Sequence, residues 1–171
     1  MPRALAVLAL CLAVLAGCAD APVAGPGADP DAAFLSAMIP HHEQALALTA
    51  MVGGRGASPG LEAIALRIDR AQVEEVGQMQ GLARARGLAV TAHHGAHAMS
   101  GMAEPATLAT LPTLCGPAFE RLWLETMIRH HEGAVAMARG YTGTDDTLGR
   151  FAQVTVAAQS AEIDAMERLL H

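Results

Sequence analysis

The sequence contains two copies of a motif built around adjacent histidines. The first reads Met38-Ile39-Pro40-His41-His42, and the second reads Met127-Ile128-Arg129-His130-His131. A second pair of motifs follows them downstream, Gln72-x-x-Glu75-Val76-x-x-Met79 and Gln159-x-x-Glu162-Ile163-x-x-Met166. Imidazole and thioether groups together form a donor set suited to copper. The pattern therefore indicates an internal duplication whose repeated side chains predict a metal site.

The spacing of these residues suits helices, where side chains three and four positions apart share a face. Met38 precedes His41 by three residues and His42 by four, so its sulfur can lie beside either ring. Glu75 lies three residues after Gln72 and four before Met79, so all three side chains can share one helix face. The candidate metal ligands are the paired residues of both copies: His41, His42, His130, His131, Met38, Met127, Glu75, Glu162, Met79 and Met166.

Two accounts of these residues remain open, because buried histidines and carboxylates must either pair or bind something. In the metal-free account, His41 or His42 bonds to Glu75 or Gln72, the second copy repeats this, and the polar interior only specifies the fold. Both copies keep two histidines, however, whereas one would suffice for a structural hydrogen bond. This favours a transition metal held for storage, buffering or delivery, with copper expected first and zinc or iron as alternatives.

The N-terminal residues have the pattern of an export signal. Arg3 precedes a short apolar run over residues 4–16, which ends at Leu15-Ala16-Gly17-Cys18. The run is too short for a membrane span of about 20 residues. We therefore expect residues 1–17 to be a lipoprotein signal peptide that is cleaved before a lipidated Cys18. The mature protein would be extracytoplasmic, in the periplasm or at the cell surface, and anchored to the membrane by its lipid.

Cysteine usage and charge narrow the possible functions. Cys11 would leave with the signal peptide, so Cys115 is the one remaining thiol, and we expect it to be a small, partly buried residue. The chain has no lysine, 11 basic against 17 acidic residues and a net charge of −6, which argues against a nucleic-acid partner. Nothing in the sequence identifies a protein partner.

The rest of the chain is predicted to be all-α, because aromatic residues make up only 3% of it while helical apolar spacing recurs. Residues 18–30 are rich in Ala, Pro and Gly and predict a flexible stalk. Start and stop signals predict helices over about 31–52, 59–87, 117–139 and 144–170. The domain over 31–171 then divides into three parts: hairpin 31–87, connector 88–116 and hairpin 117–171.

The connector contains a second group of metal donors, His93, His94, His97, Met99 and Met102. Such a biased segment is either a metal-capturing accessory loop or a polar linker that happens to be rich in histidine. Composition alone leaves both interpretations open.

The motifs together resemble the family known as domain of unknown function 305. The resemblance rests on the two His-His motifs, the two Gln-x-x-Glu motifs and Met99-Ser100-Gly101-Met102, and it covers about residues 31–170. It implies a ferritin-like four-helix bundle in a group of exported proteins, some of which bind copper. A ferritin-like fold also raises the alternative of a metalloenzyme, but the Glu-x-x-His motif of di-iron carboxylate sites does not occur here, so an enzyme is not favoured.

Overall fold

The structure is a computed structural model that describes residues 29–91 and 99–171. Its regular elements within these ranges are all helical, which confirms the all-α prediction: α1 (Pro30–Thr49), α2 (Pro59–Arg86), the short α3 (Pro105–Thr110), a 3-10 turn (Leu111–Thr113), α4 (Gly116–Arg139) and α5 (Asp146–Leu170). None of the described helices combines the length and apolar character that a membrane span requires.

The helix boundaries follow from capping residues. The side chain of Asp29 caps α1 and that of Ser58 caps α2, and each is followed by a proline at the first helical position. Asp145 caps α5 by accepting two backbone N–H groups. Gly87 ends α2 in the left-handed conformation (φ +63°), which glycine adopts without strain. These signals fix the starts of α1, α2 and α5 and the end of α2 locally, before any packing is considered.

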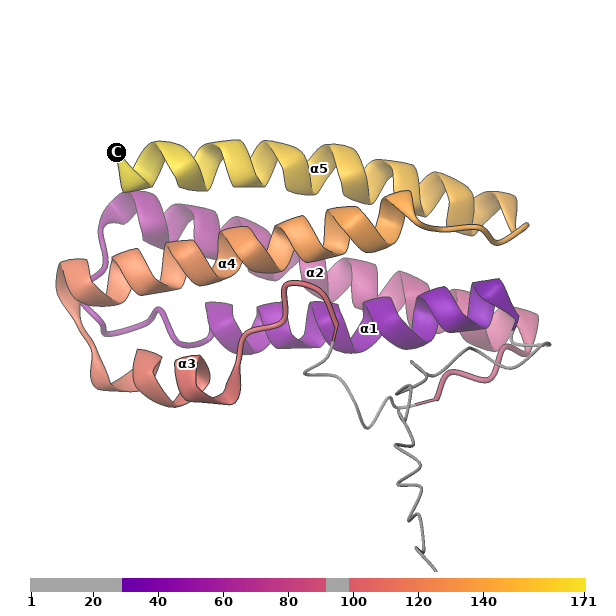
Figure 1. The fold of residues 1–171 in the computed structure, drawn as a ribbon, viewed down its shortest axis with the longest axis horizontal. Coiled ribbons are helices and arrows are strands. Elements are labelled where there is room, and N and C mark those ends of the chain that lie inside the picture. Colours follow the sequence, from indigo (N-terminus) through magenta and orange to yellow (C-terminus); the bar gives the residue numbers. More distant parts are fainter. Residues whose placement is uncertain (1–28, 92–98) are drawn as a thin grey trace, which may run out of the picture.

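The four long helices lie side by side (Figure 1). α1 packs on α2, α4 packs on α5, and the two hairpins meet through α1–α4 and α2–α5 contacts. One such contact is a buried hydrogen bond of 2.8 Å from the Trp123 indole N–H on α4 to the carbonyl of Leu48 on α1. Because adjacent helices run in opposite directions, residues near the middle of all four approach one another at the same level of the molecule.

Two apolar clusters fill the interior, one toward each end of the helices. The first contains Leu61, Phe119 and Trp123, and the second contains Phe34 and Leu148. On each of the four long helices, the buried polar residues of the repeated motifs fall between the members of these two clusters. The fold therefore places one polar layer across the middle of an otherwise apolar interior.

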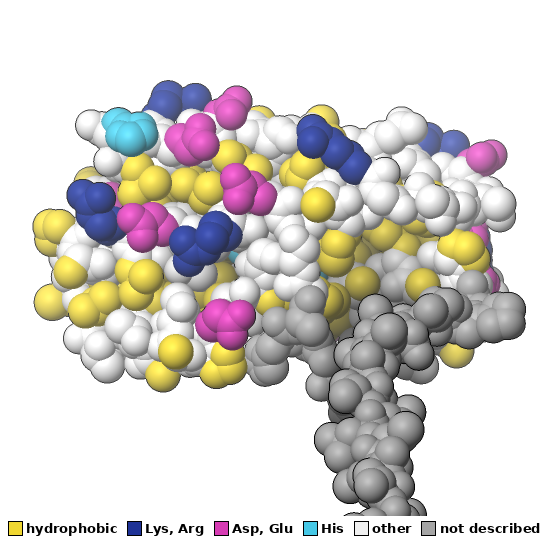
Figure 2. All heavy atoms as spheres, in the orientation of Figure 1, with side chains coloured by type: hydrophobic (Ala, Val, Ile, Leu, Met, Phe, Trp, Pro, Cys, Tyr) yellow, Lys and Arg dark blue, Asp and Glu magenta, His cyan; other side chains and the backbone are white. Residues whose placement is uncertain are grey.

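Some boundaries differ from the sequence-based prediction. α1 ends at Thr49, and the next residues continue as turns in which Met51 and Val52 donate to carbonyls three residues back. α5 begins at Asp146 because Asp145 is its cap. The connector contains α3, although no helix was predicted there. Hydrophobic side chains lie on the surface over this helix (Figure 2).

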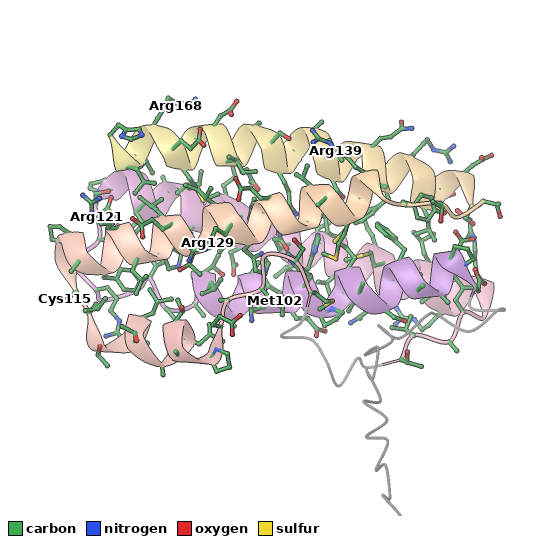
Figure 3. All side chains as sticks on the ribbon, viewed as in Figure 1. Met102, Cys115, Arg121, Arg129, Arg139 and Arg168 are labelled. Carbon is green, nitrogen blue, oxygen red and sulfur yellow. The ribbon has the colours of Figure 1, made fainter. Side chains whose placement is uncertain are left out.

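The prediction that Cys115 is partly buried is wrong. Its side chain is exposed, at the tight turn that leads into α4 (Figure 3). The adjacent Gly116 has φ +56°, and its N–H donates to the carbonyl of Arg55 at 2.7 Å. This backbone contact holds the turn against the preceding loop and leaves the thiol outside.

Candidate metal centre

The four motif histidines occupy the polar layer. His41 and His42 come from α1 and His130 and His131 from α4, and their exposed fractions are 0%, 0%, 1% and 0%. The rings of His41 and His130 face each other across the α1–α4 interface, with centroids 3.8 Å apart and planes inclined by 38°. The structure thus brings both copies of the His-His motif into one buried cluster.

Three of these rings are held through the same atom, Nε2. His42 Nε2 donates to Glu75 Oε2 at 2.9 Å, and His131 Nε2 donates to Glu162 Oε2 at 3.0 Å. His41 Nε2 donates to the backbone carbonyl of residue 100 at 3.1 Å. Carboxylate and carbonyl oxygens only accept, so each of these three Nε2 atoms carries a proton, and in a neutral ring Nδ1 then presents a lone pair.

These Nδ1 atoms and both nitrogens of His130 have no hydrogen-bond partner among residues 29–91 and 99–171. An unsatisfied buried polar group costs about 1–3 kcal/mol, so five such ring nitrogens in one layer are a substantial destabilising element. A metal ion would use one lone pair of each ring, because a neutral imidazole keeps its proton on the other nitrogen. Ligating histidines in metalloproteins commonly donate their other N–H to a carboxylate or a backbone carbonyl, which is the arrangement around His41, His42 and His131.

Burial keeps the two stacked imidazoles neutral. Desolvation lowers the pKa of His41 from 6.5 to about 3, although its hydrogen bond to the residue 100 carbonyl opposes this, and the neighbouring His42 and His131 lower it further. Desolvation also holds the pKa of His130 well below 6.5, and the nearby His41 adds to the effect. Neutral imidazole is the form that binds metals, so both rings are in the ligating state at neutral pH.

The motif methionines flank the histidine layer on both sides. Met38 and Met79 belong to the apolar cluster at one end, and Met127 and Met166 belong to the cluster at the other. All four side chains are fully buried. Each end of the layer is therefore bordered by two thioethers, one from each helix of a hairpin.

The layer also contains amide and hydroxyl groups that are not satisfied. Gln72 Oε1, both amide atoms of Gln159 and the Thr155 hydroxyl are buried and make no hydrogen bond within the described part of the chain. The two halves are not identical. Arg67 Nε lies 3.5 Å from Glu162 Oε1, whereas no arginine of the described residues pairs with Glu75 in this way. The first hairpin thus places a cation, Arg67 of α2, beside the His-Glu pair of the second hairpin.

The donors do not converge into a finished site of nitrogen and oxygen ligands. In residues 29–91 and 99–171, no group of three or more His, Cys, Asp and Glu side chains is arranged to hold a metal ion. Glu75 and Glu162 contact the histidine Nε2 atoms, so they are placed to orient the rings. Glu43 and Glu132, beside the histidines in sequence, are exposed. A metal in this layer would therefore need thioether ligands or a rotation of the rings.

The structure describes only part of the connector that was predicted to capture metal. His93, His94 and His97 lie outside the described residues, so the capture loop stays a prediction. Met99 and Met102 are half-buried. They belong to a short segment, residues 99–103, that crosses from α1 to α4 and that we call the strap. Figure 3 labels Met102 on it and Arg129 on α4.

The strap shows which residues the sequence-based reasoning missed. The carbonyl of Ser100 holds His41, and the Gln44 side chain makes two hydrogen bonds with the backbone of Ala103. One signal was available, because Gly133 lies inside a helix directly after the second His-His-Glu, where glycine is unfavourable unless another backbone comes close. A backbone acceptor such as Ser100 has no sequence signature.

The chain is similar to known proteins over most of its length. A family model described as "Domain of unknown function (DUF305)" matches residues 31–170. The chain belongs to the DUF305 family. A DUF305 structure from Deinococcus radiodurans is 34% identical, with a TM-score of 0.76, and the alignment covers 85% of this chain and 97% of that one. A DUF305 structure from Streptomyces coelicolor is 31% identical with the same TM-score, covering 83% and 92% of the two chains.

A third DUF305-like structure carries a metal. CopM in its Cu(I)-bound form is 28% identical, with a TM-score of 0.68 over 81% of this chain and 94% of that one. CopM has also been solved in Cu(II)-bound, Ag-bound and apo forms. A search of curated proteins found no match to this DUF305 chain.

Proposed function

We propose that this protein is an exported lipoprotein that binds a transition metal, copper first, in the histidine layer, and that it stores, buffers or delivers that metal. In this proposal the four long helices are a ferritin-like bundle made of two duplicated hairpins. The layer is shared, because His41 of the first hairpin stacks on His130 of the second. The ring nitrogens and the flanking thioethers supply the ligands.

One observation carries the proposal. Five buried ring nitrogens of the four histidines lack partners in the described residues, although three of the rings are each held firmly through Nε2. A purely structural pair uses the hydrogen bond and needs no free Nδ1. A metal site needs both the free nitrogen and the fixed ring.

The donor set favours copper over harder metals. Thioethers are soft ligands that select Cu(I), whereas imidazole also accepts Cu(II), and carboxylates here are already occupied by the rings. CopM, which is similar over most of this chain, has been solved with Cu(I), Cu(II) and Ag, and Ag is a soft ion like Cu(I). Zinc and iron remain alternatives to be measured.

The test is metal content at equilibrium. The purified protein is incubated with copper, zinc or iron, freed of excess metal, and measured by elemental analysis. We expect stoichiometric copper in the wild type and its loss when His41, His42, His130 and His131 are all replaced by Gln. The matched control is His171→Gln, because His171 is exposed at the end of the chain and should leave binding unchanged.

Two results would redirect the proposal. Unchanged copper in the fourfold variant would place the site in the connector, and replacing His93, His94 and His97 would then abolish binding. Absence of binding of all three metals at micromolar concentration would favour the second candidate, a metal-free interaction module. That candidate has its own support, since the His42–Glu75 and His131–Glu162 bonds are what a structural network requires.

Export and anchoring are tested separately. The proposed lipid on Cys18 predicts that the protein fractionates with membranes, and that Cys18→Ser releases it into the soluble fraction. Membrane association that survives this substitution would contradict the lipid anchor.

A further inference from the structure

The strap contacts the histidine layer through a backbone carbonyl. The carbonyl oxygen of Ser100 accepts the Nε2 proton of His41 at 3.1 Å. This ring is fully buried, and its Nδ1 has no partner in residues 29–91 and 99–171. Because a carbonyl oxygen only accepts, this hydrogen bond places the proton of the neutral His41 ring on Nε2.

Specific contacts hold the strap in place on both sides. On α1, Gln44 Nε2 donates to the Ala103 carbonyl at 3.2 Å, and its Oε1 accepts the Ala103 N–H at 2.7 Å. On α4, the strap backbone packs directly on glycine, since a Cβ placed on Gly133 would lie 2.0 Å from Ser100 O. The strap glycine itself, Gly101, has φ +80°, and a Cβ there would meet the Arg129 carbonyl at 2.4 Å. The strap is thus held by hydrogen bonds to α1 and by close backbone packing on α4.

The four histidines differ in what orients them. His42 and His131 are each held by a carboxylate from the partner helix of their own hairpin. His130 is held by no hydrogen bond within the described part of the protein. His41 depends on a residue that belongs to neither hairpin, because residue 100 lies in the connector.

We propose that the strap, residues 99–103, is a positioning element that fixes His41 in its Nε2–H form and so presents Nδ1 as a lone pair inside the layer. Ser100, through its carbonyl, does for His41 what Glu75 and Glu162 do for His42 and His131. Gln44 and Gly133 act through the strap by holding it in place. The use of that lone pair for metal rests on the proposed function, whereas the tautomer itself is a property of the metal-free protein.

The direct readout is the ring tautomer. Long-range 1H–15N spectra of the 15N-labelled, metal-free protein distinguish Nε2–H from Nδ1–H rings. We expect a single Nε2–H form for His41 in the wild type. In Gly133→Ala the new methyl group displaces the strap, and His41 should become a mixture of both tautomers. His42 and His131 serve as internal controls and should keep their Nε2–H form.

Two further variants separate this effect from general disturbance. Gly81→Ala is the matched control, because it is also a helical glycine and its Cβ would meet no described atom within 4 Å. It should leave His41 unchanged. Gln44→Ala loosens the strap by removing two hydrogen bonds without adding a clash, so it tests the same idea if Gly133→Ala does not fold.

Metal affinity gives the second readout. Loss of an outer contact that orients a ligating histidine costs about 10- to 100-fold in metal affinity. We expect a copper Kd higher by this factor in Gln44→Ala and an unchanged Kd in Gly81→Ala. A His41 ring that stays purely Nε2–H in each folded strap variant would overturn the positioning proposal. A tautomer change in a protein that binds no metal would instead uphold the positioning of His41 and refute the proposed function.

Discussion

The stacked pair His41 and His130 makes the metal-free protein sensitive to acid. Both rings are neutral in the folded state, because burial lowers the pKa of His41 to about 3 and that of His130 well below 6.5. In the unfolded chain both would titrate near 6.5. Between these pKa values the unfolded state binds more protons, so the free energy of unfolding decreases as the pH falls below about 6.5.

The size of the effect follows from linkage. A group that stays neutral in the folded state and protonates in the unfolded state changes stability by up to about 1.4 kcal/mol per pH unit. For His41, lowering the pH from about 7.5 to about 4.5 removes roughly 2–3 kcal/mol, since the lower value is still above its folded pKa of about 3. His130 contributes in the same direction. Single domains are stable by only about 5–15 kcal/mol, so the loss should be plain.

The assay is urea unfolding of the metal-free protein, followed by far-UV circular dichroism at several pH values over this range. The comparison is between the wild type and His41→Gln, in which a neutral amide replaces the titrating ring. All carboxylates, including Glu75 and Glu162, are present in both proteins, so their contribution cancels in the difference. The exposed His171 provides the control, and His171→Gln should follow the wild-type pH profile.

The expected result is a shallower loss of stability in acid for His41→Gln than for the wild type, by roughly 2 kcal/mol at about pH 4.5. Parallel pH profiles for the two proteins would refute the reasoning, because they would mean that His41 is protonated equally in the folded and unfolded states. His130→Gln tests the other ring in the same way.

Three other predictions concern separate parts of the structure. Ser58→Ala should lower the free energy of unfolding by about 1–2 kcal/mol in urea titrations, because Ser58 caps α2 and its hydroxyl also donates to Glu120 at 2.6 Å. A smaller loss than in a surface Ser→Ala variant would contradict this. Cys115 should react with a maleimide in the native protein as fast as in urea, since it is exposed, and protection in the native state would argue against the structure of this turn. Glu75→Gln should weaken copper binding about 10- to 100-fold in competition titrations, whereas the exposed neighbour Glu74→Gln should not, and equal effects would refute an orienting role.

The sequence predicted the long helices well because their ends depend on local chemistry. Asp29 and Ser58 each precede a proline, and Gly87 follows the last residue of α2, so these boundaries can be recognised without tertiary information. α3 was missed although Pro105 stands at its first turn, because so short a helix has no apolar periodicity to read. The start of α5 was placed two residues early, because Thr144 and Asp145 are both acceptable caps.

The repeated motifs predicted which side chains share the buried layer but not how these side chains connect to one another. Helical spacing was enough to place His42 on the same hairpin as Glu75, because the His-His motif lies on one helix and the Gln-x-x-Glu motif lies on the next helix of the hairpin. The stacking of His41 on His130 depends on how two hairpins meet, which periodicity does not specify. The contact to Ser100 goes through a backbone carbonyl, and every residue has one, so residue type carries no signal for it.

The indole of Trp123 gives this protein a built-in optical reporter. It is the single tryptophan of the sequence, it is fully buried, and its N–H bonds across the α1–α4 interface to the Leu48 carbonyl. Leu48 lies seven residues, about two helical turns, beyond His41, and Trp123 lies seven residues before His130, so both contacts join the same two helices. Any opening of α1 from α4 wets the indole and shifts its emission to longer wavelength. The state of the interface that carries the histidine stack can thus be followed in real time in the unlabelled protein.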